Sequence, residues 1–114
     1  MSFNWKDYVD LAEELLKRED EASHRSAVSR AYYGVFCIAR NRLSMTYDKS
    51  RSVHWQVIKR LWKSNNPKHK RLAKILSDLK RARERADYEE DSFKWEDAKI
   101  MVLLSKEALS LLKE

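Results

Sequence analysis

The residue that most suggests chemistry in this chain of 114 residues is Arg83, a cation within an apolar helical stripe. In a helix, Arg83 lies at the same angle as Leu76 and Leu79, whereas Arg81 and Arg85 point away from that face. A cation on the core side of a helix needs an anionic partner or a functional role, because an unpaired buried charge is costly.

Two interpretations of Arg83 follow from its surroundings in the sequence. Asp87 stands four residues later, where the two side chains can form an ion pair beside the core. Alternatively, Arg83 lines a cleft that an external anion enters. The spacing favours the structural ion pair and leaves the second interpretation open.

A second candidate is the basic segment 49–85, which holds 13 basic and 2 acidic side chains. The terminal segments 1–24 and 86–114 each carry a net charge of −4, and segment 25–48 carries +3, within a total of +6. Such a field attracts phosphates or an acidic partner, although a solvated helical face explains it equally well. The cations predicted to bind nucleic acid or another anion are Lys68, Lys70, Arg71, Arg83 and Arg85.

Aromatic side chains alternate with cations in this segment, as Trp55 and Trp62 do with Lys59 and Lys63. Exposed rings could stack on bases while the cations neutralise phosphates. The amphipathic spacing of segment 53–64 instead predicts that both tryptophans belong to the core.

Metal and nucleophile chemistry have little support. His24, Cys37, His54 and His69 lack the spacing of zinc ligands, so we expect no metal and no cofactor. Cys37 lies in an apolar helical pattern and is expected to pack inertly. A single cysteine cannot form an internal disulfide, which fits a reducing cytoplasm.

One glycine and one proline exclude β-sandwiches, barrels and glycine-rich nucleotide sites, so the composition predicts an all-α protein. We expect one domain over residues 1–114. No apolar run approaches the roughly 18 residues of a membrane span, and no signal peptide is visible, so a cytoplasmic protein is expected.

The apolar periodicity predicts five helices, at about 4–18, 22–43, 53–64, 67–88 and 92–112. Asn4 and Asn66 are the expected N-caps of the first and fourth, and Pro67 suits the first helical position. Gly34 interrupts the second helix, where it indicates a close helix crossing.

The last helix carries a second apolar stripe, formed by Ile100, Leu104 and Leu111, opposite its main one. A terminal helix of a monomer should have one polar face that is exposed to solvent. The second stripe therefore favours a partner subunit and a homodimer, although scattered surface leucines are the alternative.

The segment Arg25–Arg40 (RSAVSRAYYGVFCIAR) and the later segment Arg83–Tyr88 (RERADY) resemble the HEPN superfamily. The likeness is to its small prokaryotic branch, with a Ser-Arg-Ala-Tyr-Tyr helix and an Ala-Asp-Tyr motif. The resemblance implies an up-and-down bundle of four to five helices, which often dimerises and often pairs with a small nucleotidyltransferase in toxin–antitoxin operons. Within these motifs, Arg30, Tyr33 and Asp87 are assigned structural roles.

Catalytic HEPN proteins are metal-independent endoribonucleases that use Arg-x4–6-His. Arg83 matches the arginine, but Tyr88 stands where the histidine is expected, and Cys37 stands where relatives often carry histidine. A tyrosine with a pKa near 10 is poorly suited to acid–base work at neutral pH. We therefore predict a non-catalytic or weakly active binding module associated with RNA or a nucleotide, with Arg83 and Tyr88 as the catalytic candidates. An active endoribonuclease and a purely structural adaptor remain the alternatives.

Overall fold

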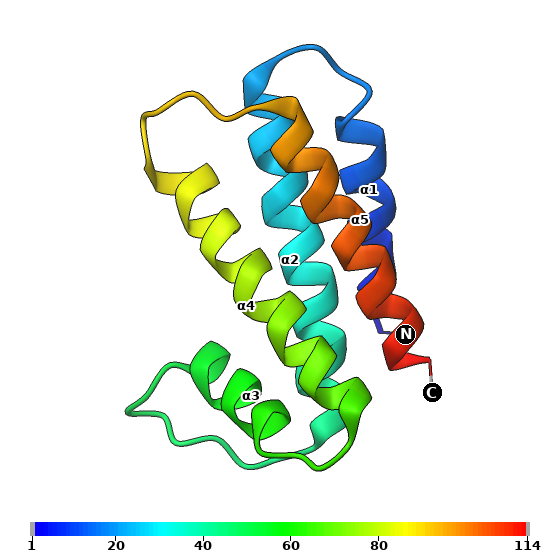
Figure 1. Cartoon of the computed structure of the whole chain (residues 1–114), viewed down its shortest axis with the longest axis vertical. Helices are drawn as coiled ribbons and strands as arrows, with labels where there is room; N and C mark the ends of the chain where they lie inside the picture. The colour runs from blue at the N-terminus through cyan, green and yellow to red at the C-terminus, as the bar shows by residue number, and fades with distance from the viewer. Residues whose placement is uncertain (1, 114) are drawn as a thin grey trace.

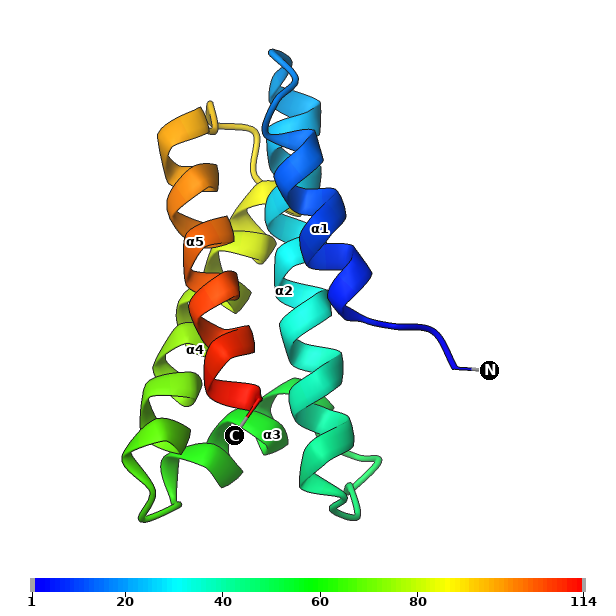
Figure 2. The same ribbon diagram turned by 90° about the vertical axis from the view of Figure 1, so that its right-hand side faces the viewer.

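The computed structural model describes residues 2–113, which form five α-helices (Figure 1). The helices are α1 (Lys6–Leu15), α2 (Glu21–Leu43), α3 (Val53–Trp62), α4 (Pro67–Tyr88) and α5 (Trp95–Leu112). This described part of the chain contains no strand, which confirms the all-α prediction. The four helices α1, α2, α4 and α5 run alternately up and down, and the short α3 lies beside one end of α4 (Figures 1 and 2).

The helix boundaries follow from capping side chains. Asp20 accepts a hydrogen bond from the Ser23 amide and begins α2, and Asn66 accepts one from the Lys68 amide and begins α4 at Pro67. The predicted cap at Asn66 is therefore confirmed. These side chains satisfy amide groups that have no partner within the first turn of a helix.

The first and last helices differ most from the prediction. The first helix begins at Lys6 and ends at Leu15, and its N-cap is Trp5, so the predicted cap at Asn4 is wrong. Asn4 still accepts a hydrogen bond from the Lys6 amide at 3.1 Å. The last helix begins at Trp95 rather than near residue 92. The reason is Phe93, whose side chain is buried between α2, α4 and α5, so that the chain stays non-helical until it has passed this residue.

The core is centred on α2, which contacts all four other helices. Tyr32 and Val35 of α2 are fully buried, as are Ile75 and Leu76 of α4. Burial of each such side chain contributes roughly 1.5–3 kcal/mol. The same packing holds the α2 face that carries Tyr32 in a fixed position against α4.

Gly34 lies at the point where α1 crosses α2, as its position in the sequence predicted. A Cβ atom here would come within 2.9 Å of the Val9 side chain and 3.0 Å of the Trp5 carbonyl oxygen. The backbones can approach this closely only because the residue has no side chain.

We expect Gly34→Val to destabilise the protein by about 2 kcal/mol, because the added methyl groups force α1 away from α2. Urea unfolding measures this change. Ser26→Val, at an exposed position of the same helix, is the matched control and should change the free energy of unfolding by less than about 0.5 kcal/mol. Equal effects of the two substitutions would show that α1 does not approach α2 closely at residue 34.

The second stripe of α5 is only partly exposed. Ile100 is 52% exposed, whereas Leu104 and Leu111 are half-buried and pack against the core. The large apolar side chains that α5 leaves open to solvent are Trp95, Ile100 and Leu103, so the stripe expected to face a partner is largely used within the bundle. The homodimer remains a prediction. No helix in the described residues is both long enough and apolar enough to span a membrane.

Candidate functional site

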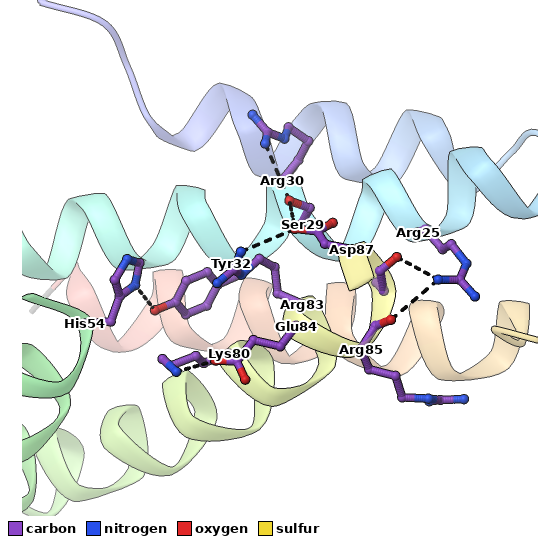
Figure 3. Close-up of polar contacts among 11 residues, drawn as sticks. Arg25, Ser29, Arg30, Tyr32, His54, Lys80, Arg83, Glu84, Arg85 and Asp87 are labelled. Carbon is purple, nitrogen blue, oxygen red and sulfur yellow. Dashed lines mark hydrogen bonds and ion pairs between the residues drawn. The ribbon is translucent and has the colours of Figure 1, made fainter. Parts of the chain in front are cut away.

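Arg83 projects from α4 towards α2 and is only 13% exposed (Figure 3). Its Nη1 atom lies 3.4 Å from Asp87 Oδ2, so the ion pair expected from the four-residue spacing is present. The separation is long for a charge-assisted hydrogen bond, which is usually 2.7–2.9 Å. Asp87 therefore neutralises Arg83 without saturating its hydrogen-bonding capacity.

Three tyrosine rings surround the Arg83 guanidinium. Its central carbon lies 5.4 Å from the ring centre of Tyr33 and 5.9 Å from those of Tyr32 and Tyr88. The Nε atom is buried and has no hydrogen-bond partner among residues 2–113. A guanidinium has five N–H donors, and among residues 2–113 the Arg83 side chain interacts with the Asp87 carboxylate and the Tyr88 hydroxyl, which leaves donors to spare. The aromatic rings hold Arg83 in place while its donors stay available.

A second guanidinium approaches the same face from α2. Arg30 packs over the rings of Tyr8 and Tyr33, at 4.8 and 5.6 Å from their centres. Its Nη2 atom donates to the Ser29 hydroxyl at 3.5 Å, and that hydroxyl donates to Asp87 at 3.4 Å. Packing between rings fits the structural role predicted for Arg30, and it also places a second cation close to Arg83.

His54, from α3, reaches the same cluster and was not assigned a role from the sequence. Its ring stacks on Phe36 at 4.2 Å, and its Nδ1 atom shares a 2.5 Å hydrogen bond with the Tyr32 hydroxyl. The imidazole tautomer sets the direction of this bond. Burial, helped by the nearby charges of Arg83 and Lys80, lowers the pKa of His54, so the imidazole is neutral at neutral pH. Its Nε2 atom makes no hydrogen bond within the described structure.

The lowered pKa of His54 predicts a pH-dependent stability. The pKa of His54 is about 6.5 in the unfolded chain and lower in the folded protein. At a pH between these two values the unfolded chain binds a proton that the folded protein does not, so acid favours unfolding. The contribution of neutral His54 is fully present above about pH 6.5 and is lost as the pH falls below that value. Urea unfolding across this range should show a shallower pH dependence for His54→Gln than for the unmodified protein. Identical slopes would mean that His54 titrates normally.

The other predicted anion-binding residues do not join this cluster. Arg85 faces α5, with its Nη1 atom 3.6 Å from Asp97. Arg71 makes a bidentate ion pair with Glu107, with donor–acceptor distances of 2.6 and 2.8 Å, and Lys70 donates to the Trp62 carbonyl. Lys68, Lys70 and Arg71 occupy the first turns of α4, about 20 Å along the helix from Arg83. The predicted set is therefore divided between two ends of one helix.

The prediction for the tryptophans of α3 is wrong. Trp55 is 44% exposed and Trp62 is 43% exposed. The helix buries Val57 and Leu61 instead, and Trp55 and Trp62 share another face because they stand seven residues apart. Cys37 is buried as expected, and burial raises the pKa of its thiol.

No family model, no curated protein and no solved structure matches this chain. Within residues 2–113, no group of three or more His, Cys, Asp or Glu side chains is close enough together to hold a metal ion. What α2, α3 and α4 bring together is two guanidinium groups, tyrosine rings and a neutral imidazole.

Proposed function

We propose that this chain is an RNA-binding module of the HEPN type, in which Arg83 holds a backbone phosphate. The observation that carries the proposal is the state of the Arg83 guanidinium. It is nearly buried and packed against tyrosine rings, its ion pair with Asp87 is long, and its buried Nε–H group has no partner among the described residues. A phosphate offers several strong acceptor oxygens and matches the planar fork of a guanidinium.

The charges around Arg83 also favour an anion. Three cations, Arg30, Lys80 and Arg83, stand against two carboxylates, Glu84 and Asp87 (Figure 3). Each carboxylate is already paired with a cation of the same helix, Glu84 with Lys80 and Asp87 with Arg83. The excess positive charge is available to a ligand.

The resemblance of Arg25–Arg40 and Arg83–Tyr88 to the HEPN superfamily supports RNA as the anion. It also supports the remaining parts of the proposal, namely a cytoplasmic homodimer with a nucleotidyltransferase of a toxin–antitoxin system as its partner. Light scattering tests the dimer separately from RNA binding.

Fluorescence anisotropy with a labelled RNA oligonucleotide at increasing salt tests the proposal. We expect Arg83→Gln to weaken binding roughly 10- to 100-fold and to reduce the slope of log K against log salt by about 0.7, the share of one phosphate contact to a single strand. Arg18→Gln removes the same charge from an exposed position outside the cluster, so it should leave the affinity nearly unchanged. Equal effects of the two variants, or binding that does not depend on salt, would contradict the proposal.

A metal-independent endoribonuclease is the second candidate, and the observation that favours it is His54. When the Nδ1–H group of His54 donates to the Tyr32 oxygen, Nε2 presents a lone pair that could take a proton from a ribose 2′-hydroxyl. Incubation of RNA with the protein in EDTA tests this activity. Cleavage that is lost in both His54→Gln and Arg83→Gln would support the enzyme, whereas intact RNA supports the binding module.

A further inference from the structure

A groove between α3 and α4 lies next to the Arg83 cluster and encloses about 290 Å³. Its lining consists of Trp55, Ile58, Ser77, Lys80, Arg81 and Glu84. An aromatic and an aliphatic side chain therefore form part of a concave surface whose other members are polar or charged. Such a surface suits a flat ring that carries a charged group.

Trp55 presents its indole to solvent in this groove, although burial of the same ring would stabilise the fold. Two cations lie over the ring, the Lys59 amine at 4.4 Å and the Arg51 guanidinium at 5.7 Å from its centre. Lys59 has no carboxylate partner among the residues that the structure describes, whereas Arg51 is 3.7 Å from Asp48. An exposed indole beside an unpaired amine combines a stacking surface with a charge that can hold a phosphate.

The groove and the Arg83 cluster are continuous along α4. Lys80 and Glu84 line the groove, and the charges of both also act on His54 in the cluster. Figure 3 shows this pair beside Tyr32 and Arg83. Lys80 precedes Arg83 by about one helical turn, so an RNA backbone that contacts Arg83 can continue past Lys80 into the groove.

We infer that Trp55 is a stacking platform for an unpaired base, so that the RNA bound here is single-stranded. The inference rests on the proposed function and names the form of RNA that the site accepts. In a duplex the bases are stacked on one another and their faces are not accessible to an indole, whereas every unpaired base can stack on an aromatic ring.

Anisotropy measurements with single-stranded RNA and with a duplex of the same sequence test the inference. We expect Trp55→Leu to weaken single-strand binding roughly 5- to 150-fold, while Trp55→Tyr retains most of the affinity because it keeps an aromatic face. Trp62→Leu is the matched control, since Trp62 is equally exposed on the same helix but does not line this groove. It should leave the affinity unchanged, and circular dichroism shows whether each variant is folded.

The outcomes separate this inference from the proposed function. If Arg83→Gln weakens binding and Trp55→Leu does not, RNA binds without stacking on Trp55 and only the inference is overturned. Equal losses in Trp55→Leu and Trp62→Leu, or a duplex affinity as high as that of the single strand, also overturn it. If the unmodified protein binds no RNA, both proposals are wrong.

Single-stranded DNA should also bind through Trp55, because the stacking contact is made to the face of the base and not to the sugar.

Discussion

Arg25→Ala should lower the free energy of unfolding by about 3 kcal/mol and the melting temperature by roughly 10 °C. Arg25 extends from α2 across the end of α4, and its side chain is 18% exposed. Its Nη1 atom donates to the carbonyl oxygens of Ala86 and Glu89, at 2.8 and 2.6 Å, and Nη2 donates to that of Asp91. Glu21 holds the same guanidinium through a 2.8 Å ion pair.

The expected loss is large because one side chain satisfies the Ala86 carbonyl group in the last turn of α4 and two carbonyl groups, of Glu89 and Asp91, in the segment that follows. The same bonds hold the segment that leads into the buried Phe93. Arg18→Ala is the matched control, since Arg18 is 67% exposed and pairs only with the nearby Asp20, and it should cost less than about 0.5 kcal/mol. Thermal unfolding of both variants measures the difference. A similar small loss for both would show that Arg25 does not hold the end of α4.

Tyr32→Ala is expected to have the largest effect of all, a loss of about 3–5 kcal/mol. Tyr32 is fully buried, and its ring lies 5.4 Å from Tyr33 and 5.6 Å from both Phe36 and His54. Truncation leaves a cavity between α2, α3 and α4 and removes one ring that packs against Arg83. The free energy of unfolding of a small domain is about 5–15 kcal/mol in total. Urea unfolding should therefore show that this variant is only marginally stable.

Tyr32→Phe separates packing from hydrogen bonding at the same position. It keeps the ring and removes only the hydroxyl that pairs with His54, so it should cost about 1 kcal/mol. Burial raises the pKa of Tyr32, which keeps the hydroxyl protonated and available for this bond. If Tyr32→Phe were as unstable as Tyr32→Ala, the hydrogen bond rather than the ring would dominate.

Much of the fold could be predicted from local patterns. The helix that begins at Pro67 follows from Asn66 as its cap, and the crossing at Gly34 follows from a glycine within an apolar helix. The late start of α5 could not be predicted in the same way. It depends on the burial of Phe93 against α2 and α4, which is a tertiary contact with no local signal.

The candidate site was predictable only where its residues share one helix. The ion pair between Arg83 and Asp87 was predicted correctly because side chains four residues apart on a helix lie next to each other. His54 and Arg25 were missed because their partners lie 22 or more residues away in the sequence. For His54, the one available signal was its position four residues before the half-buried Ile58, which places the imidazole on the inner face of α3.

The tryptophans show the opposite error. Apolar spacing alone predicted burial for Trp55 and Trp62, but α3 is a helix of ten residues at one end of the bundle, and only one of its faces is turned towards α2 and α4. Val57 and Leu61 occupy that face. The exposed rings are therefore a feature that only the structure could identify.

The Nε–Hε resonance of Arg83 in an isotope-labelled protein reports directly on whether a phosphate approaches this guanidinium. It is assigned by its absence from the spectrum of Arg83→Lys. Titration with single-stranded RNA should shift this resonance in a saturable manner, at the RNA concentrations that produce the anisotropy change, while the resonance of Arg18 stays in place. RNA that binds, as judged by anisotropy, but leaves the Arg83 resonance unmoved would contradict the assignment of Arg83 as the phosphate-binding residue.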